Sequence, residues 1–592
     1  KTLEPSDGHS YNVAIGHQSG KSITTGTFNT VLGGLAGDAL TTGTGNVALG
    51  YNALSDETTG GQNIAIGNNA MSSSQLSQHN IAIGQDALQN VTLASLNNSY
   101  NIGIGYSAGN DVTSGKKNIL IGGLAGALMT TAEHNIGIGY NALGGGSSTA
   151  ITGGSNVAIG TNAGSNMSSG GSNTAVGYQA GLAVTTGVSN TFMGSGAGDA
   201  INTGDYNVAI GRGALSTEDQ FGYNVAVGTF SLLNQNAADN AFNTAVGYNT
   251  GGNITTGVRN TIMGGSAGDS ITTGSYNIAL GYNSLATEDT TGRNVAIGYN
   301  ALANQNAASD AYNVAIGYNA GITVTSGTEN TLVGGKAGDA LTEGARNVAL
   351  GKSALSAEDT GSRNVAVGWS ALGALNYDGN GNNTALGYYA GALIQSGFNN
   401  TIIGSLAGDA LTTGDNNIII GHNAAASAVD VDNTTVIGTT STTNALVHGL
   451  KQPVIAASAN VAAAAAFPNS IFNFSDADGA SVTLPDSGDG SQIGKSYEFI
   501  TTATATSNIH QIVLSDQNDE VFIGNLTKVT TGGTDVISDI SLASDEFREI
   551  NMNGTTQGGI KGSYVKCTNI AVDLWHVQGT LICSGTIASA FN

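Results

Sequence analysis

Apolar residues in the first three quarters of the chain recur in short groups, each framed by an asparagine and a glycine. The string N-[V/I/T]-x-[I/L/V/M]-G returns every 17 residues, or every 19 or 21 at a few steps, from Asn12 to Asn417, and a degenerate copy begins at Thr434. Apolar residues at positions 1 and 3 after the asparagine share one face of a short strand. β-branched residues and frequent glycine disfavour a helix. The pattern therefore predicts one short β-strand per repeat.

The remaining columns of the repeat predict how the chain returns to the next strand. Alanine stands at position 7 in twenty copies, and T-T-G or a related string closes many of them. We expect the alanines to form a second inward row in which only a small side chain fits, and T-T-G to form a turn. Glycine at position 4 allows a sharp corner with positive φ or a close approach of two backbones. The predicted corner glycines include Gly16, Gly33, Gly50, Gly211, Gly281, Gly351 and Gly421.

The asparagine occurs once per repeat at one location, and we expect its side-chain amides to form a ladder, each bonded to its copies above and below. The predicted ladder includes Asn12, Asn29, Asn46, Asn63, Asn80, Asn190, Asn260, Asn330 and Asn400. Together the columns predict an all-β fold, a parallel β-solenoid of about 25 stacked coils over residues 12–443. Each coil, or rung, rises about 4.8 Å, so the rod is expected to be on the order of 120 Å long.

A longer period is superimposed on the rungs. Asn190, Asn260 and Asn330 each open a unit of 70 residues, in which a 19-residue step follows the third rung, and Asn400 opens a shortened fourth unit. We expect each longer rung to carry a bulge, at residues 234–242, 304–312 and 375–382. Such regular units indicate extension by tandem duplication, which lengthens a spacer.

The last 140 residues lack the repeat. Residues 444–468, with a run of small side chains at 456–466, predict a linker or a short helix. Residues 469–592 alternate apolar and polar positions between turn-rich strings, which predicts a compact antiparallel β-sandwich or jelly roll, with Trp575 and Phe499 in its core. The two cysteines flank a predicted hairpin in which Cys567 lies opposite His576 or Val577. We therefore expect Cys567 and Cys583 to be free, buried thiols.

Composition narrows the class of protein. Eighty-nine glycines with only four prolines and no Gly-X-Y period exclude collagen, and 40% hydrophobic residues with 10% charged residues argue against disorder. A net charge of −24 makes nucleic acid and anionic lipid poor partners. No apolar run is long enough to insert into a membrane. Residues 1–11 precede the first rung and do not begin with methionine, so we expect either that a segment was removed or that the chain is a fragment.

No pattern predicts catalysis, a cofactor or a metal. The eight histidines lack ligand spacing. Asp199, Asp269, Asp339 and Asp409 recur only every four rungs, roughly 19 Å apart, which is too far for them to share a calcium ion. The carboxylate pairs Glu218-Asp219, Glu288-Asp289 and Glu358-Asp359 are adjacent in sequence, so we interpret them as solvated turn charges. The sequence predicts a protein that is not an enzyme.

The repeat resembles known attachment proteins. N-V-A-I-G followed by an alanine and a turn glycine is similar to the head repeats of trimeric autotransporter adhesins (YadA-like heads), and N-T-A-L-G-Y-Y-A-G and N-V-A-I-G-Y-N-A-L look like repeats in fibre proteins of marine bacteriophages. The strings S-V-T-L-P-D, N-M-N-G-T-T-Q-G-G and D-L-W-H-V-Q-G resemble a terminal β-domain of such phage proteins. The resemblance implies a left-handed β-roll that assembles as a homotrimer and acts in attachment.

On this basis we expect a virion fibre or spike, with the solenoid as shaft, that attaches to a glycan or protein receptor on a host surface. The alternative is a secreted bacterial or archaeal cell-surface adhesin, or a subunit of an extracellular filament that assembles head to tail. Both place the protein on a virion surface or outside the cell. A glycan depolymerase, the third hypothesis, lacks an active-site constellation.

Overall fold

The computed structural model divides the chain into two compact units, Lys1–Ala445 and Leu446–Asn592. It describes residues 10–145 and 150–439 in the first unit. In the second unit it describes residues 454–457, 461–462, 471–474, 480–487, 492–501, 510–514, 521–530, 536–537, 549–552, 563–571 and 574–583. Apart from residues 10 and 11, the predicted N-terminal segment 1–11 therefore lies outside the described residues.

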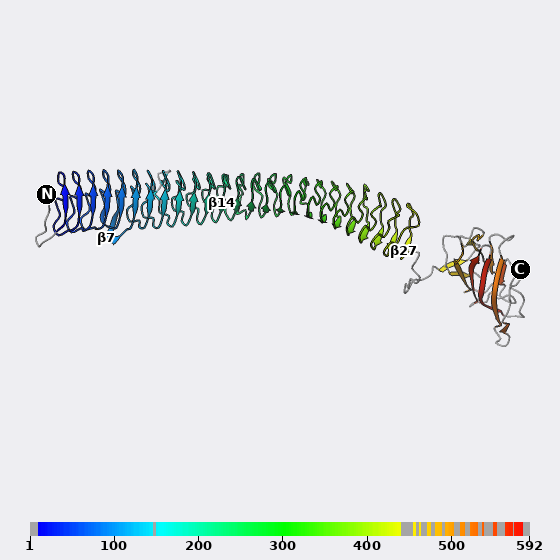
Figure 1. Ribbon diagram of the computed structural model, residues 1–592. Helices are drawn as coiled ribbons and strands as arrows, with labels where there is room; N and C mark the ends of the chain where they lie inside the picture. Colours follow the sequence, from blue (N-terminus) through cyan, green and yellow to red (C-terminus); the bar gives the residue numbers. More distant parts are fainter. Residues whose placement is uncertain are drawn as a thin grey trace. The chain divides into compact units, whose positions relative to one another are not determined.

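The first unit is the predicted parallel β-solenoid (Figure 1), which confirms the fold class and the period. Its 25-stranded sheet takes one three-residue strand from each rung, and successive strands pair in parallel and in register, as Val13 does with Thr30. A second, two-stranded sheet pairs β5 (Gln75–Gln78) with β7 (Thr92–Asn98). The strands of the large sheet are β1 (Val13–Ile15), β2 (Thr30–Leu32), β3 (Val47–Leu49), β4 (Ile64–Ile66), β6 (Ile81–Ile83), β8 (Ile102–Ile104), β9 (Ile119–Ile121), β10 (Ile136–Ile138), β11 (Val157–Ile159), β12 (Thr174–Val176), β13 (Thr191–Met193), β14 (Val208–Ile210), β15 (Val225–Val227), β16 (Thr244–Val246), β17 (Thr261–Met263), β18 (Ile278–Leu280), β19 (Val295–Ile297), β20 (Val314–Ile316), β21 (Thr331–Val333), β22 (Val348–Leu350), β23 (Val365–Val367), β24 (Thr384–Leu386), β25 (Thr401–Ile403), β26 (Ile418–Ile420) and β27 (Thr435–Ile437).

The strands face the opposite way from the sequence prediction. Positions 1 and 3 share one face, as expected, but that face is the outer one, and the residue between them, at position 2, points into the coil. In β17, Ile262 is buried whereas Thr261 and Met263 are exposed. Describing the alanines as a second inward row implied that positions 1 and 3 form the first, and this was wrong because the coil is narrow. Its interior already holds the asparagine, position 2, the alanine of position 7 and the residues at positions 8 and 11.

The narrow core explains the 70-residue period, because large side chains occupy inward positions 2, 8 and 11 alternately from rung to rung. The rung of Asn190 has Phe192 at position 2 and a glycine, Gly198, at position 8, where a β-carbon would come within 2.4 Å of the phenyl ring. The next rung has Ala209 at position 2 and Leu215 at position 8. A bulky residue at one position is thus matched by a small one at another, which keeps the interior filled at constant volume.

The second unit is the separate β-domain predicted after the solenoid, and its two sheets contain parallel as well as the expected antiparallel pairs. Residues 454–457 and 461–462 are strands, and each adds a parallel strand to one of the two sheets. The prediction of a linker or a short helix was therefore wrong for these residues. One sheet contains β28 (Val454–Ala457), β30 (Ile471–Phe474), β32 (Ser496–Thr501), β34 (Val521–Thr530), β35 (Val536–Ile537), β37 (Tyr564–Ala571) and β38 (Leu574–Cys583); the other contains β29 (Val461–Ala462), β31 (Ser481–Thr483), β33 (His510–Val513) and β36 (Glu549–Met552).

The core and the hairpin of the second unit agree with the sequence prediction. Trp575 and Phe499 are fully buried. Cys567 pairs in register with Val577, one of the two partners expected, and is a buried free thiol. The side chain of Cys583 lies outside the described residues, so the prediction for that thiol stays a prediction.

Candidate functional site and surfaces of the shaft

The asparagines form a continuous hydrogen-bonded ladder inside the shaft. Each side-chain oxygen accepts from the backbone N–H of the next asparagine, as Asn12 Oδ1 does from Asn29 N at 2.8 Å, and the amide nitrogen of Asn29 donates to Gly43 O of its own rung at 2.9 Å. The structure places all nine predicted ladder residues in this column, each at most 3% exposed: Asn12, Asn29, Asn46, Asn63, Asn80, Asn190, Asn260, Asn330 and Asn400. The ladder joins each rung to the next through backbone groups that the turns leave unpaired.

The seven predicted corner glycines all lie at the turn that follows the strand. Their φ values fall between 132° and 142°, a region that a residue with a side chain rarely adopts. These residues are Gly16, Gly33, Gly50, Gly211, Gly281, Gly351 and Gly421. At Gly33 a β-carbon would come within 2.3 Å of the carbonyl oxygen of Gly50 in the next rung. Both reasons for glycine, the dihedral angle and the close approach, therefore apply at the same corner.

The glutamates of the predicted solvated pairs are not solvated. Glu218, Glu288 and Glu358 occupy position 11 and are fully buried, as is Glu57 in an earlier rung. The interpretation as turn charges was wrong because the backbone N–H groups of the turn point inward and need an acceptor. Glu358 Oε1, for example, accepts from Gly361 N at 2.8 Å and from Tyr377 N at 3.3 Å.

These buried carboxylates are coupled to the longer rungs. Glu218 reaches Ala237 N at 3.5 Å, and Ala237, like Tyr377, belongs to a 19-residue rung that stacks on the rung of the glutamate. Burial raises the pKa of Glu218 to about 6 and that of Glu358 to about 7. Each glutamate thus accepts hydrogen bonds from backbone N–H groups of the longer rung, but its burial disfavours the charged form of the carboxylate.

The aspartates at position 9 do not gather into a metal site. Burial raises the pKa of Asp199, Asp269 and Asp339, but the three lie in separate 70-residue units. Among the described residues, no three His, Cys, Asp or Glu side chains come close enough together to hold a metal ion.

The outer face of the 25-stranded sheet is an exposed apolar strip. Ile15 is 57% exposed, and Met263 and Leu386 are each 48% exposed, although all three are large hydrophobic residues. We name this surface the apolar strip; its most exposed members are Val13, Ile15, Leu32, Leu49, Ile83, Ile159, Met193, Met263, Ile278, Ile316, Leu350, Leu386, Ile418 and Ile437. Because every rung contributes positions 1 and 3, the strip runs the whole length of the sheet.

A second surface follows the residue that precedes each asparagine, which the sequence prediction did not single out. This residue adopts a positive φ and points outward, and from Tyr206 to Tyr312 its side chains stack from rung to rung. We name the series the aromatic–arginine column; it comprises Tyr206, Tyr223, Phe242, Arg259, Tyr276, Arg293, Tyr312, Glu329, Arg346 and Arg363. Reading that one position down the repeats would have revealed it.

The contacts in the column are regular. The rings of Tyr206, Tyr223 and Phe242 stack with centroids 5.1 Å apart at each step. Arg259 then lies between two rings, 5.9 Å from the centroid of Phe242 and 5.5 Å from that of Tyr276. Arg293 similarly lies between Tyr276 and Tyr312, and the stack thus continues through seven rungs.

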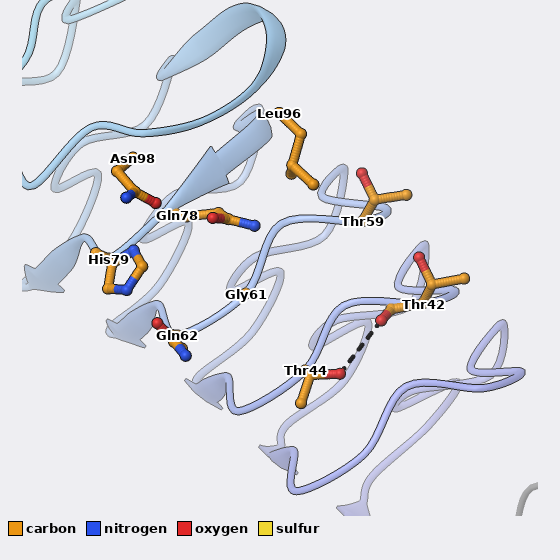
Figure 2. A pocket seen from close by; sticks show the side chains of 9 residues that line it. All are labelled: Thr42, Thr44, Thr59, Gly61, Gln62, Gln78, His79, Leu96 and Asn98. Carbon is orange, nitrogen blue, oxygen red and sulfur yellow. Dashed lines mark hydrogen bonds between the residues drawn. The ribbon is translucent and has the colours of Figure 1, made fainter.

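Toward the N-terminal end, the residues that precede Asn63 and Asn80, namely Gln62 and His79, line a polar groove of about 810 Å³ (Figure 2). Its other lining residues come from the turns of neighbouring rungs, from β5 and from β7, and they are Thr42, Thr44, Thr59, Gly61, Gln78, Leu96 and Asn98. At this end of the shaft, the position before the asparagine therefore borders a concave surface that extends across several rungs.

Within the described part of the chain, the structure contains no helix long and apolar enough to cross a membrane. Comparison with protein-family models, with curated proteins and with solved structures finds no match for this chain. The surfaces of the shaft are therefore the basis on which its function can be argued.

Proposed function

We propose that this protein is a structural fibre: the solenoids of three copies pack side by side along their apolar strips to form a shaft that attaches a virion to a host surface. The observation that carries the proposal is the apolar strip. In most rungs this chain buries only an alanine at position 2 of the strand, whereas the Ile, Leu, Val and Met residues at positions 1 and 3 lie on the outer face, many of them exposed. Such a distribution is typical of a surface that another protein covers.

The size of the strip supports an obligate interface. Twenty-five strands at about 4.8 Å give a length on the order of 120 Å, and two rows of side chains give a width of about 10 Å. The resulting face is on the order of 1,000 Å² per copy, whereas the largest exposed apolar patch on a typical monomer is about 300–600 Å². Obligate interfaces bury about 2,000 Å² or more in total, which two such faces supply.

The arrangement of the copies follows from the shape of the strip. A second copy of the chain is the occupant whose pattern matches, because its exposed side chains recur at the same rung spacing. Closed rotational symmetry about an axis parallel to the shaft would cover every strip and leave none free. Three copies is the number that the resemblance to trimeric autotransporter heads implies. A shaft of this kind has the rigid, extended form that attachment requires.

Sedimentation equilibrium of the whole chain, together with electron microscopy, tests the proposal. We expect a mass of three chains and rods of one fixed length. The double variant Leu350→Lys/Leu386→Lys places two charges in the apolar strip and is expected to dissociate the assembly into monomers. The control Thr273→Lys/Thr413→Lys adds the same charges at exposed turn positions and should leave the mass unchanged.

Three results would contradict the proposal. A monomeric mass for the unmodified chain would mean that the strip is not covered by copies of this chain. Equal dissociation in both double variants would mean that net charge, rather than the strip, controls assembly. Open-ended filaments of variable length would favour the extracellular filament subunit instead of the discrete fibre.

A further inference from the structure

We infer that the aromatic–arginine column is a binding surface for an extended anionic polysaccharide, one that carries carboxylate or sulfate groups and lies along the shaft. The inference builds on the proposed attachment role and adds the chemical class of the ligand. It starts from the distribution of positive charge. The chain has six arginines and a net charge of −24, yet four of the six arginines occupy this one column within seven rungs.

Two of these guanidinium groups have no carboxylate partner in the described part of the chain. Arg293 pairs with Asp310, and Arg346 Nε bonds Glu329 Oε2 at 2.7 Å. Arg259 instead lies over the rings of Phe242 and Tyr276, and its Nη1 donates to the hydroxyl of Tyr276 at 2.9 Å. Arg363 makes no ion pair there. An exposed arginine held by stacking keeps donors free, in the planar arrangement that matches a carboxylate or a sulfate.

The backbone conformation of the column is a second reason to infer a ligand. Every residue of the column has a left-handed φ, for example 57° at Arg259 and 61° at Tyr276. Glycine and asparagine adopt this conformation with less strain, and Asn382, Asn399, Asn416 and Asn433 occupy the same position in later rungs. The turn therefore does not require an aromatic ring or an arginine. Large side chains thus occupy a strained position that asparagine or glycine would occupy with less strain.

The spacing of the charges selects a polymer of low charge density. Arg259 and Arg363 are six rungs apart, about 30 Å, so that one ligand reaches both only if it is extended. Arg259 and Arg293 are two rungs apart, and Arg293 and Arg346 are three. A nucleic acid strand carries one charge per about 3.4 Å and would be repelled by the acidic remainder of the shaft. Repulsion from carboxylates farther than about 8 Å is screened at physiological salt, which leaves a sparsely charged chain free to bind.

The neutral part of a polysaccharide also finds partners. The hydroxyls of Tyr276 and Tyr312 each accept a hydrogen bond from an arginine, so their own hydrogens remain available to a sugar hydroxyl. The groove in Figure 2 shows that the same position of the repeat, at Gln62 and His79, lies beside threonine and asparagine side chains from neighbouring rungs. Polar donors and acceptors in a shallow, open groove suit a hydroxyl-rich chain better than an apolar one.

Surface plasmon resonance with the whole, assembled protein tests the inference. The probes are polygalacturonate, dextran sulfate, neutral dextran and single-stranded poly(dT). We expect binding to at least one of the two anionic polysaccharides that is at least tenfold tighter than binding to neutral dextran. The stronger of the two identifies carboxylate or sulfate as the preferred group.

The double variant Arg259→Gln/Arg363→Gln removes the two unpaired charges of the column and should weaken that binding at least fivefold. The control Arg212→Gln/Lys352→Gln removes two positive charges at position 5, after the corner glycine, and should change the affinity less than twofold. Equal losses in the two variants, failure of both anionic polysaccharides to bind, or tighter binding of poly(dT) would overturn the inference.

The mass of each sample, measured by sedimentation equilibrium, separates this result from the fate of the fibre. If the assembly is intact and binds neither anionic polysaccharide, the inferred ligand is refuted but the proposed fibre is not. If the protein is a monomer that binds one of them through the column, the trimeric shaft is refuted but the inferred ligand is not.

Discussion

Replacing Glu358 with glutamine should stabilise the shaft at neutral and alkaline pH. The carboxyl is fully buried, and only one of its oxygens has hydrogen-bond donors, Gly361 N and Tyr377 N. The other oxygen, Oε2, is buried without a partner. Burial, with a smaller contribution from the negative charge of Asp378, raises the pKa of this group from 4.5 to about 7. Glutamine keeps the accepting oxygen and removes the charge.

The sign and size of the effect follow from this pKa. A carboxyl whose pKa is higher in the folded state stabilises the fold below its unfolded pKa, and that stability is lost as the pH rises from about 4.5 to about 7. At about 1.4 kcal/mol per pKa unit, the loss reaches about 3 kcal/mol by pH 8. Glu358→Gln should therefore raise local stability at pH 8 by up to about 3 kcal/mol and change it little at pH 4.

Glu57 provides the matched control, because both of its oxygens accept. Its Oε1 accepts from Thr58 N, Gly60 N and Leu76 N, and its Oε2 accepts from the backbone N–H and the hydroxyl of Ser77, all between 2.7 and 3.1 Å. In Glu57→Gln a side-chain NH₂ would face at least one of these donors. We expect a loss of about 1–3 kcal/mol at pH 8, opposite in sign to the effect at Glu358.

Hydrogen exchange followed by mass spectrometry measures both effects locally, which matters because a solenoid is stabilised rung by rung. Peptides that cover residues 347–382 and 46–80 report on the two sites, with exchange rates corrected for the intrinsic effect of pH. The reasoning would be refuted if Glu358→Gln exchanged faster than the unmodified chain at pH 8, or if both variants changed in the same direction.

Three further predictions concern single residues of the fold. Gly334→Ala should destabilise the shaft by about 2–5 kcal/mol, since φ is 139° and the β-carbon would lie 2.5 Å from Gly351 O. The adjacent Gly335→Ala, whose β-carbon would have nothing within 4 Å, should cost less than about 0.5 kcal/mol. Equal losses of stability in thermal unfolding would contradict this prediction. Asn260→Ala leaves Asn277 N and Gly274 O unpaired inside the coil and should cost about 2–5 kcal/mol in urea unfolding, whereas Asn399→Ala, which removes an exposed amide pair, should cost less than about 1 kcal/mol. Burial raises the pKa of the Cys567 thiol, so iodoacetamide at pH 8 should modify this residue only after unfolding, as mass spectrometry of its peptide will show; modification of the folded protein would disprove its burial.

Part of the shaft's chemistry could be predicted from the sequence and part could not. The asparagine and glycine columns could be assigned because one residue type recurs at one position, and a stacked repeat turns that regularity into a ladder. The aromatic–arginine column was overlooked because its members differ in chemistry, although all precede an asparagine. The burial of Glu218 and Glu358 could not be read from the chain, because a carboxylate next to an aspartate in a polar turn normally faces solvent.

The period, the parallel stacking and the number of rungs could be predicted from the sequence, because a 17-residue repeat with one strand per copy can pair its backbone only with its neighbours. The sequence also identified the core of the second unit at Trp575 and Phe499. Which face of each strand is buried became known only from the packing of the coil. Alternation over three residues assigns positions 1 and 3 to one side but does not say which side is inside. The limited volume of the coil settles that choice in favour of position 2, and the apolar side chains at positions 1 and 3 are left on the surface.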